Sequence, residues 1–392
     1  MAIPDDSRRI FKASVLNPIA PDRVDAYAPG YLTVAGGKIE QLTSDDPRPA
    51  LRFAEYIDIS HKTIMPGFVD THVHLPQFAI MGIGSGELLS WLNTYTYPEE
   101  ARFADPEYAA KISQQFFDAL VANGTTTAVV YSSVHEEATD IAFCAARASG
   151  IRAFIGKVMM DRNSPDALLE ETEQSISRSV RLFNKWDGAE EGRLRYIFTP
   201  RFAAACSMQL MKRVGEIALE RGAFVQSHLS ENRHEVEWVR RLFPSSPSYA
   251  AVYHGAGLLT ERSIMAHCIH LAPDEIALLS RARTKVAFCP YSNRTLRSGT
   301  MPYQTLRDAG LNISLGTDVA GGPSLSMLEQ MRETMTAAQI PWSEALYLAT
   351  LAGAKALGLA GRIGNFERGK DADFVVVAND VVEEVYVRGR RV

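Results

Sequence analysis

Short runs of strand-forming residues alternate with amphipathic stretches along the middle of the chain. Apolar residues recur at three- and four-residue spacing in Pro106–Ala122, Ser207–Arg221 and Pro273–Ala282, and this period predicts helices. Eight strand candidates accompany them: Ile64–Thr71, Thr125–Tyr131, Arg152–Val158, Leu194–Thr199, Phe224–His228, Ser263–His267, Lys285–Cys289 and Ile313–Asp318. Because strands alternate with helices, we expect an α/β fold with a parallel sheet, and eight units are the number that closes a (β/α)8 TIM-type barrel.

The two ends of the chain have a different pattern. Residues 1–63 contain strand-like runs and turn signals such as Gly36-Gly37, and the tail Ala372–Val392 is again strand-like. We therefore predict that residues 64–358 form the barrel. Residues 1–63 and 359–392 are expected to pair into one small β-sandwich domain built from both chain ends.

Composition narrows the classes of function. The 392 residues are 46% hydrophobic and 22% charged, as in folded globular proteins. The net charge of -5 lacks the basic excess of a nucleic-acid-binding protein, so no such partner is expected. No apolar run reaches the ~18 residues of a membrane span, and the first residues carry Asp and Arg where a secretory signal is apolar. We therefore expect no membrane partner, and a cytoplasmic protein.

Five residues able to bind a metal end four of the predicted strands. His72 and His74 stand two apart where the first predicted strand ends. In extended backbone both imidazoles face the same side and can converge on one ion. His228, His267 and Asp318 end three other strands, and barrel enzymes place their chemistry at the C-terminal ends of their strands. Imidazoles and a carboxylate without thiolates suit zinc or ferrous iron, either of which can acidify a bound water.

Proton transfer has candidates beside these ligands. Glu231 lies three residues after His228, where it can take a proton from a metal-bound water and return it to a substrate. The alternative is a carboxylate that favours the start of a helix near Asn232. Asp318 can both bind the metal and accept a hydrogen bond from the attacking water, and His267 can hold that water rather than bind the metal.

Longer motifs carry a resemblance to a known family. PGFVDTHVHLPQ (Pro66–Gln77), together with the strand-end histidines and aspartate, resembles the amidohydrolase superfamily of metal-dependent hydrolases. Further stretches are similar to the guanine deaminase branch, in unbroken order from about residue 60 to residue 376. They include WLNTYTYPEEARF, TPRFAAAC, QSHLSENRHEVE and LGTDVAGGPSLSML.

The resemblance implies one zinc per chain and a homodimer, while the ligand types leave ferrous iron as the second option. It implies that the metal ligands are His72, His74, His228 and Asp318. It further implies that His267 stands beside the attacking water and that Glu231 is the proton shuttle. The catalytic residues are then Glu231, His267 and Asp318.

The resemblance also implies a guanine pocket and the hydrolytic deamination of guanine to xanthine and ammonia by a zinc-bound hydroxide. Gln77 would meet the purine edge, Arg201 would bind the O6 carbonyl, and Phe202 would pack on the ring. Three residues near the metal, His228, Glu231 and Asp318, would also contact the substrate. Arginine offers a planar fork of donors that suits a carbonyl. The alternative for Arg201 is a buried salt bridge.

Three other interpretations stay open. A deaminase of the same fold could act on a pterin, 8-oxoguanine or another amino-heterocycle such as a triazine. A catalytically silent scaffold could use the same barrel, although such proteins typically lose ligands. A binuclear hydrolase would use Lys157, which closes the third predicted strand, to bridge two metals. We favour a structural role for Lys157 because the ligand set already completes a mononuclear site. Two roles also stay open for Trp91, which either covers the pocket or packs in the core.

Overall fold

The computed structural model describes residues 8–84 and 86–392, and most of them form a barrel. Its parallel strands follow one another in chain order: β5 (Phe68–His74), β6 (Thr125–Tyr131), β7 (Arg152–Gly156), β9 (Leu194–Pro200), β10 (Phe224–Leu229), β11 (Ser263–His267), β12 (Lys285–Phe288) and β13 (Asn312–Leu315). The short β8 (Val158–Met159) pairs with β9. The ring closes where Asp318 N donates to His72 O at 2.8 Å and His74 N donates to Val319 O at 3.1 Å. The predicted barrel is confirmed.

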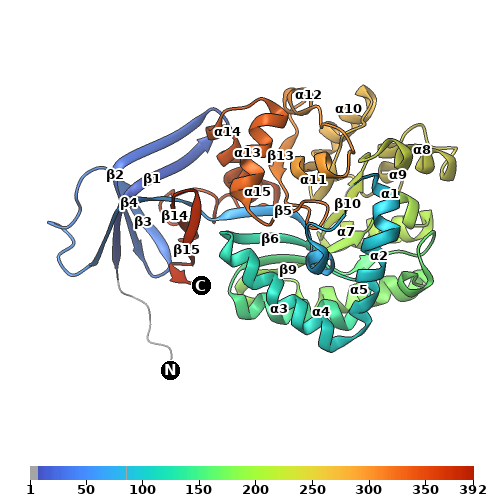
Figure 1. The fold of residues 1–392 in the computed structure, drawn as a ribbon, viewed down its shortest axis with the longest axis horizontal. Coiled ribbons are helices and arrows are strands. Elements are labelled where there is room, and N and C mark those ends of the chain that lie inside the picture. Colours follow the sequence, from blue (N-terminus) through green and yellow to red (C-terminus); the bar gives the residue numbers. More distant parts are fainter. Residues whose placement is uncertain (1–7, 85) are drawn as a thin grey trace.

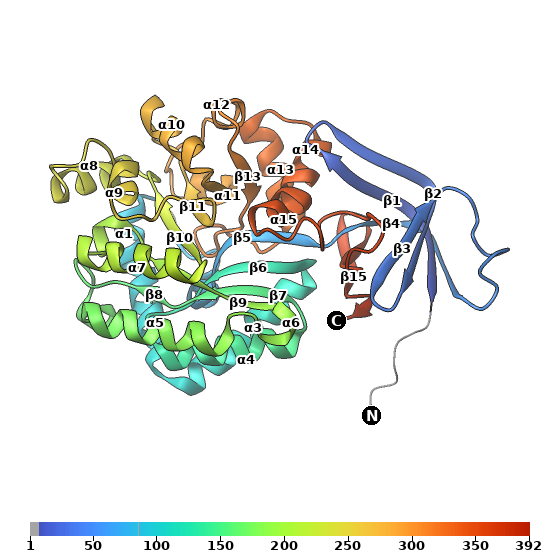
Figure 2. The ribbon, with the colours of Figure 1, turned by 180° about the vertical axis from the view of Figure 1, so that it is seen from behind.

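Helices surround the strands in both ribbon views (Figure 1, Figure 2). The longer ones are α3 (Pro106–Ala122), α4 (Glu136–Ser149), α5 (Thr172–Trp186), α7 (Met208–Arg221), α8 (Arg233–Leu242), α10 (Pro273–Ala282) and α13 (Met327–Ala338). The shorter ones are α1 (Leu88–Trp91), α2 (Tyr97–Ala101), α6 (Ala189–Gly192), α9 (Tyr249–Gly255), α11 (Pro290–Thr295), α12 (Tyr303–Asp308), α14 (Trp342–Tyr347) and α15 (Gly353–Ala356).

Local chemistry sets the helix ends. Helix α3 has the predicted bounds because Pro106 stands at its first position and the Asp105 side chain accepts a hydrogen bond from Glu107 N. Helix α7 begins one residue later than predicted because Ser207 is its N-cap, whose hydroxyl accepts from Leu210 N at 3.0 Å.

The first barrel strand differs from the prediction. Ile64–Pro66 ends β4 (Glu55–Pro66) in the other sheet, and the barrel strand β5 begins only at Phe68. The chain crosses between the sheets at Gly67, where an added Cβ would lie 2.2–2.8 Å from the Thr126 side chain. The predicted bounds of this strand were therefore wrong, and β5 extends to include both His72 and His74.

The chain ends form one separate mixed sheet, in the order β16-β15-β14-β4-β1-β2-β3. Besides β4, its strands are β1 (Arg9–Ala20), β2 (Arg23–Ala35), β3 (Lys38–Thr43), β14 (Phe374–Ala378), β15 (Val381–Val387) and β16 (Arg390–Arg391). Strands from both ends share its apolar core, in which Phe374 stacks on Tyr386 at 4.4 Å and meets Phe11 edge-on. The β domain built from both ends is confirmed, while its division from the barrel at residues 63/64 and 358/359 stays a prediction.

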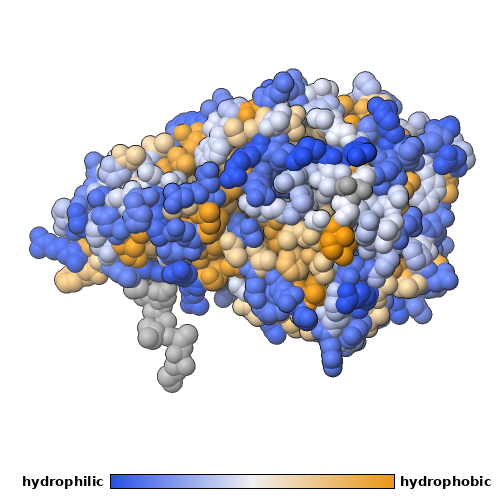
Figure 3. All heavy atoms as spheres, in the orientation of Figure 1, coloured by the Kyte–Doolittle hydropathy of each residue, from blue (hydrophilic) through white to orange (hydrophobic). Residues whose placement is uncertain are grey.

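Polar residues cover most of the face drawn in Figure 3, and apolar residues gather where the β domain meets the barrel. Within the part of the chain that the structure describes, no helix is both long enough and apolar enough to span a bilayer.

Candidate metal centre and active site

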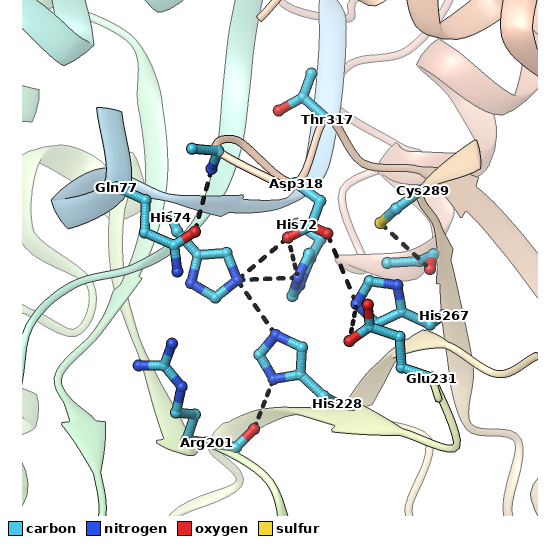
Figure 4. A network of polar contacts seen from close by, with 12 residues as sticks. His72, His74, Gln77, Arg201, His228, Glu231, His267, Cys289, Thr317 and Asp318 are labelled. Atoms are coloured by element: carbon cyan, nitrogen blue, oxygen red, sulfur yellow. Dashed lines mark hydrogen bonds and ion pairs between the residues drawn. The ribbon is translucent and has the colours of Figure 1, made fainter. Parts of the chain in front are cut away.

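Strand ends bring the predicted ligands to one point. His72 and His74 come from β5, His228 from β10, His267 from the last residue of β11, and Asp318 from the segment after β13 (Figure 4). The Nε2 atom of His74 lies 3.2 Å from Nε2 of both His72 and His228. Asp318 Oδ1 lies 3.1 Å from His72 Nε2 and 3.3 Å from His74 Nε2. His267 also offers an atom within 4.8 Å of ligand atoms of His72, His228 and Asp318.

The donor set fits a divalent metal ion. His228 Nδ1 donates to the Arg201 carbonyl at 2.6 Å, which leaves a lone pair on Nε2 facing His74. Facing lone pairs and a carboxylate are compatible with one another when a cation lies among them. Ligand atoms bound to one tetrahedral zinc at 2.0–2.1 Å lie about 3.3 Å apart, which matches the N–N and N–O distances.

Protonation states agree with ligation. Burial lowers the pKa of His74 to about 4 and lowers the pKa of His228 well below its usual value, so both imidazoles are neutral at pH 7. Burial alone would raise the pKa of Asp318, but His72 and His74 outweigh it and hold that pKa well below its usual value. Neutral imidazoles and an ionised carboxylate are the forms that bind metals.

His267 is oriented toward the same space. Its Nδ1 donates to the Asn293 side-chain oxygen at 2.9 Å, so the lone pair is on Nε2. That buried Nε2 has no hydrogen-bond partner among the described residues. It lies 3.4 Å from Glu231 Oε2 and 3.8 Å from Asp318 Oδ2. The nitrogen is therefore placed to accept a hydrogen bond from a bound ligand.

Glu231 has the properties of a proton carrier. Burial and the nearby Asp318 raise its pKa well above the usual value of a glutamate. Its Oε1 accepts a hydrogen bond from the Ser298 hydroxyl at 3.0 Å. Glu231 is not needed to start helix α8, because Asn232 caps that helix and Glu235 completes the capping box. The alternative role of Glu231 at a helix start therefore falls to these two residues.

Asp70 is a buried site residue that the sequence analysis did not select. Its carboxylate accepts from the Thr317 hydroxyl at 2.5 Å, from Thr317 N at 3.1 Å and from His72 N at 3.2 Å. Burial raises its pKa to about 7. Asp70 thereby fixes the segment that carries Asp318 against the strand that carries His72. The available signal was its position two residues before His72, on the same side of the strand.

A pocket opens beside this cluster. Its walls are formed by His74, Gln77, Leu88, Trp91, Leu92, Arg201, Phe202, His228, Glu231, Glu235, His267, Leu296, Asp318 and Gly321. Trp91 is buried, lines the pocket, and is held by a 3.2 Å hydrogen bond from Nε1 to the Ile83 carbonyl. An apolar wall with a few fixed polar groups suits a flat, polar-edged ligand.

Arg201 and Gln77 share one partner inside the pocket wall. The Arg201 guanidinium forms a buried ion pair with Glu100, and Gln77 Nε2 donates to the same carboxylate at 3.0 Å. The buried salt bridge considered for Arg201 is therefore present, and Arg201 also lines the pocket. Glu100 comes from α2 and was missed, because nothing in the local sequence distinguishes it from its neighbours.

Lys157 is held outside the metal cluster. Its buried ammonium pairs with Glu170, and it lies 3.0 Å from the Val158 carbonyl and 3.3 Å from the Ser175 hydroxyl. A lysine engaged in this way does not bridge two metals, which argues against the binuclear alternative.

The barrel, the composite β domain and the His/Asp cluster define the class of metal-dependent barrel hydrolases. The chain belongs to the amidohydrolase family, whose model matches residues 63–392. It is 42% identical over 326 residues to guanine deaminase of Escherichia coli (strain K12), which covers 82% of this chain and 74% of that protein. It is 40% identical over 333 residues to guanine deaminase of Dictyostelium discoideum, with the same coverage. The crystal structure of guanine deaminase from C. acetobutylicum with bound guanine superposes with a TM-score of 0.94 at 32% identity, covering 98% of this chain and all of that one.

Proposed function

We propose that this protein deaminates guanine hydrolytically to xanthine and ammonia. The observation that carries the proposal is a pocket in which a donor wall, Arg201 and Gln77, faces the same space as the His/Asp metal cluster. Its relatives at about 40% identity are named guanine deaminases, and a matched structure holds guanine in its active site.

The residues that would hold the metal are His72, His74, His228 and Asp318. Their nitrogen and oxygen donors suit zinc first and ferrous iron second. When bound, such an ion supplies a hydroxide at neutral pH by lowering the pKa of a coordinated water to about 7.

Proton transfer falls to three side chains around the reacting carbon, C2 of guanine. Glu231, with its raised pKa, accepts a proton from the attacking water and passes it to ring N3, which makes C2 more electrophilic. His267 Nε2 and Asp318 Oδ2, 3.8 Å apart, orient that water. Asp318 or Glu231 then takes the proton of the new C2 hydroxyl and delivers it to the exocyclic amine, so that the C2–N bond breaks, ammonia leaves and the C2 carbonyl forms.

Recognition of the ring rests on the opposite wall. The Arg201 fork donates to the O6 carbonyl, Gln77 meets the purine edge, and Phe202 packs on the ring face. His228, Glu231 and Asp318 contact the substrate on the metal side. Adenine has no O6 carbonyl and would leave the Arg201 donors that Glu100 does not hold without an acceptor, which disfavours it.

The test is a steady-state comparison of guanine, isoxanthopterin, 8-oxoguanine and adenine by ammonia release. We expect guanine to give the highest kcat/KM, about 100-fold or more above adenine. Activity confined to isoxanthopterin would overturn the guanine proposal in favour of a pterin deaminase.

The family resemblance also supports a homodimer that acts in the cytoplasm. Light scattering of the purified protein is expected to give twice the 43.2 kDa of one chain. A mass of one chain at micromolar concentration would contradict the dimer.

A further inference from the structure

Glu100 lies behind the recognition wall, which is the pair Arg201 and Gln77, and does not line the pocket itself. It comes from α2 and is 2% exposed, as is Arg201. One carboxylate oxygen accepts from Gln77 Nε2 at 3.0 Å, and the other pairs with the Arg201 guanidinium. One carboxylate therefore binds both side chains that are proposed to read the purine edge.

The pairing fixes the orientation of Gln77. Its Oε1 accepts from Ala320 N at 3.1 Å while its Nε2 donates to Glu100, so the two ends of the amide are assigned by different partners. One amide hydrogen and one lone pair are then left for a ligand. Without Glu100 the hydrogen bond from Ala320 N would be left as the one contact among the described residues that sets the orientation of the amide group.

The same carboxylate aims Arg201. One guanidinium nitrogen is held by Glu100, and the group lies over the Tyr97 ring at 5.2 Å. Because a guanidinium is rigid and planar, holding one nitrogen sets the direction of the remaining donors. The negative charge also balances a buried cation that would otherwise attract water or any acceptor.

We propose that Glu100 is a positioning residue that determines specificity for a purine bearing a carbonyl at C6, acting through Arg201 and Gln77. This inference rests on the proposed function. Glu100 sets the direction in which Arg201 and Gln77 donate, and it does not contact the substrate itself.

A neighbouring glutamate provides a matched control. Glu99 is in the same helix and is 7% exposed, but its carboxylate pairs with Arg102 at 2.9 Å and with the Tyr108 hydroxyl, away from the pocket. Glu99→Gln and Glu100→Gln therefore remove the same charge from the same helix, and only the second change touches the recognition wall.

The experiment compares guanine with 2-aminopurine, which keeps the 2-amino group and lacks the C6 carbonyl. Affinity for each is measured as KM or as a competitive inhibition constant. Glu100→Gln is expected to lower the preference for guanine over 2-aminopurine about 10- to 100-fold, mainly through a higher KM for guanine. Glu99→Gln is expected to leave that ratio within about twofold of the wild type.

Other outcomes separate the possible failures. A Glu100→Gln protein that loses thermal stability but keeps the wild-type ratio overturns the proposal, because a merely structural residue would weaken both ligands alike. If that variant does not fold, Glu100→Asp decides, since the shorter side chain keeps the charge but withdraws it from its partners and must still lower the ratio. Wild-type protein that does not deaminate guanine refutes the proposed function instead.

A double variant tests whether Glu100 acts through Arg201. Once Arg201→Gln has removed the recognition fork, adding Glu100→Gln is expected to change the ratio by less than about threefold. Fully additive losses would show that Glu100 acts independently and would overturn the proposal.

Discussion

Two groups of buried charges lie at opposite ends of the barrel, and they differ in how completely they are paired. At the start of β7, Arg152 donates to Asp373 at 2.9 Å and pairs with Asp371, which also binds Lys38 and Arg362. At the other end, imidazole nitrogens face one another and a carboxylate at 3.1–3.3 Å.

The difference teaches how to distinguish structural charges from functional ones. Charges that satisfy each other join the β domain to the barrel and need no ligand. Imidazole nitrogens and a carboxylate packed at such distances form an arrangement that a bound cation stabilises. Burial alone does not distinguish the two groups, whereas a count of donors against acceptors does.

The largest expected effect comes from Glu231→Gln at the incompletely paired end. Loss of the proton carrier is expected to lower kcat about 100- to 10,000-fold, while bound metal and melting temperature stay near wild type. Ammonia release and elemental analysis of the same sample check this. Turnover near the wild-type rate would refute the shuttle role.

A change at the fully paired end should act on stability instead. Asp371→Asn leaves Arg152 paired with Asp373 and is expected to cost about 1.5–3 kcal/mol of the free energy of unfolding. The kcat of the folded protein should stay unchanged. Urea denaturation measures the loss, with Asp380→Asn as a control because its side chain is 88% exposed. Equal loss in both variants would contradict the structural role.

The stability of the fold should depend on pH through the protonation of Asp371. Burial alone would raise the pKa of Asp371, but Lys38, Arg152 and Arg362 outweigh it and hold that pKa below its usual value. A depressed pKa stabilises the fold above the unfolded value of about 3.9, and this contribution is lost as pH falls through the folded pKa. Melting temperatures of wild type and Asp371→Asn should therefore converge below about pH 4. A constant difference from pH 7 to pH 3 would contradict this assignment.

The smallest effect on stability is expected at Lys157. Its charge is paired with Glu170, although it lies at the same end of the barrel as the metal cluster. Replacing Lys157 and Glu170 together with Met removes both charges and should change stability by less than about 1.5 kcal/mol, with metal content unchanged. Lys157→Met alone should cost more, because it leaves Glu170 in a buried site. Loss of bound metal in the double variant would favour a metal-binding role for Lys157.

The sequence predicted the barrel and its ligand cluster because both depend on local signals. Parallel strands end at one edge, so His228 and His267 could be placed together from strand ends. Asp318 joins them although the predicted strand Ile313–Asp318 was too long, because β13 ends at Leu315 and Asp318 lies in the segment after it. Ile64–Pro66 was misplaced because an apolar run does not show which of two sheets takes it, and β1 was not predicted.

Residues that orient others were beyond the reach of sequence patterns. Glu100 meets partners 23 and 101 residues away, and Asp70 meets Thr317 where the last strand closes the barrel against the first. Ser298 reaches Glu231 from a loop 67 residues further along the chain. Such contacts follow from the folded geometry and leave no regular spacing in the chain.

The most direct test of the central claim is a zinc titration of metal-stripped protein, followed by ammonia release from guanine. Activity should rise in proportion to added zinc and level off at one equivalent per chain, because His72, His74, His228 and Asp318 meet around one point. Full activity without metal, or a plateau only at two equivalents, would contradict a single zinc held by these four side chains.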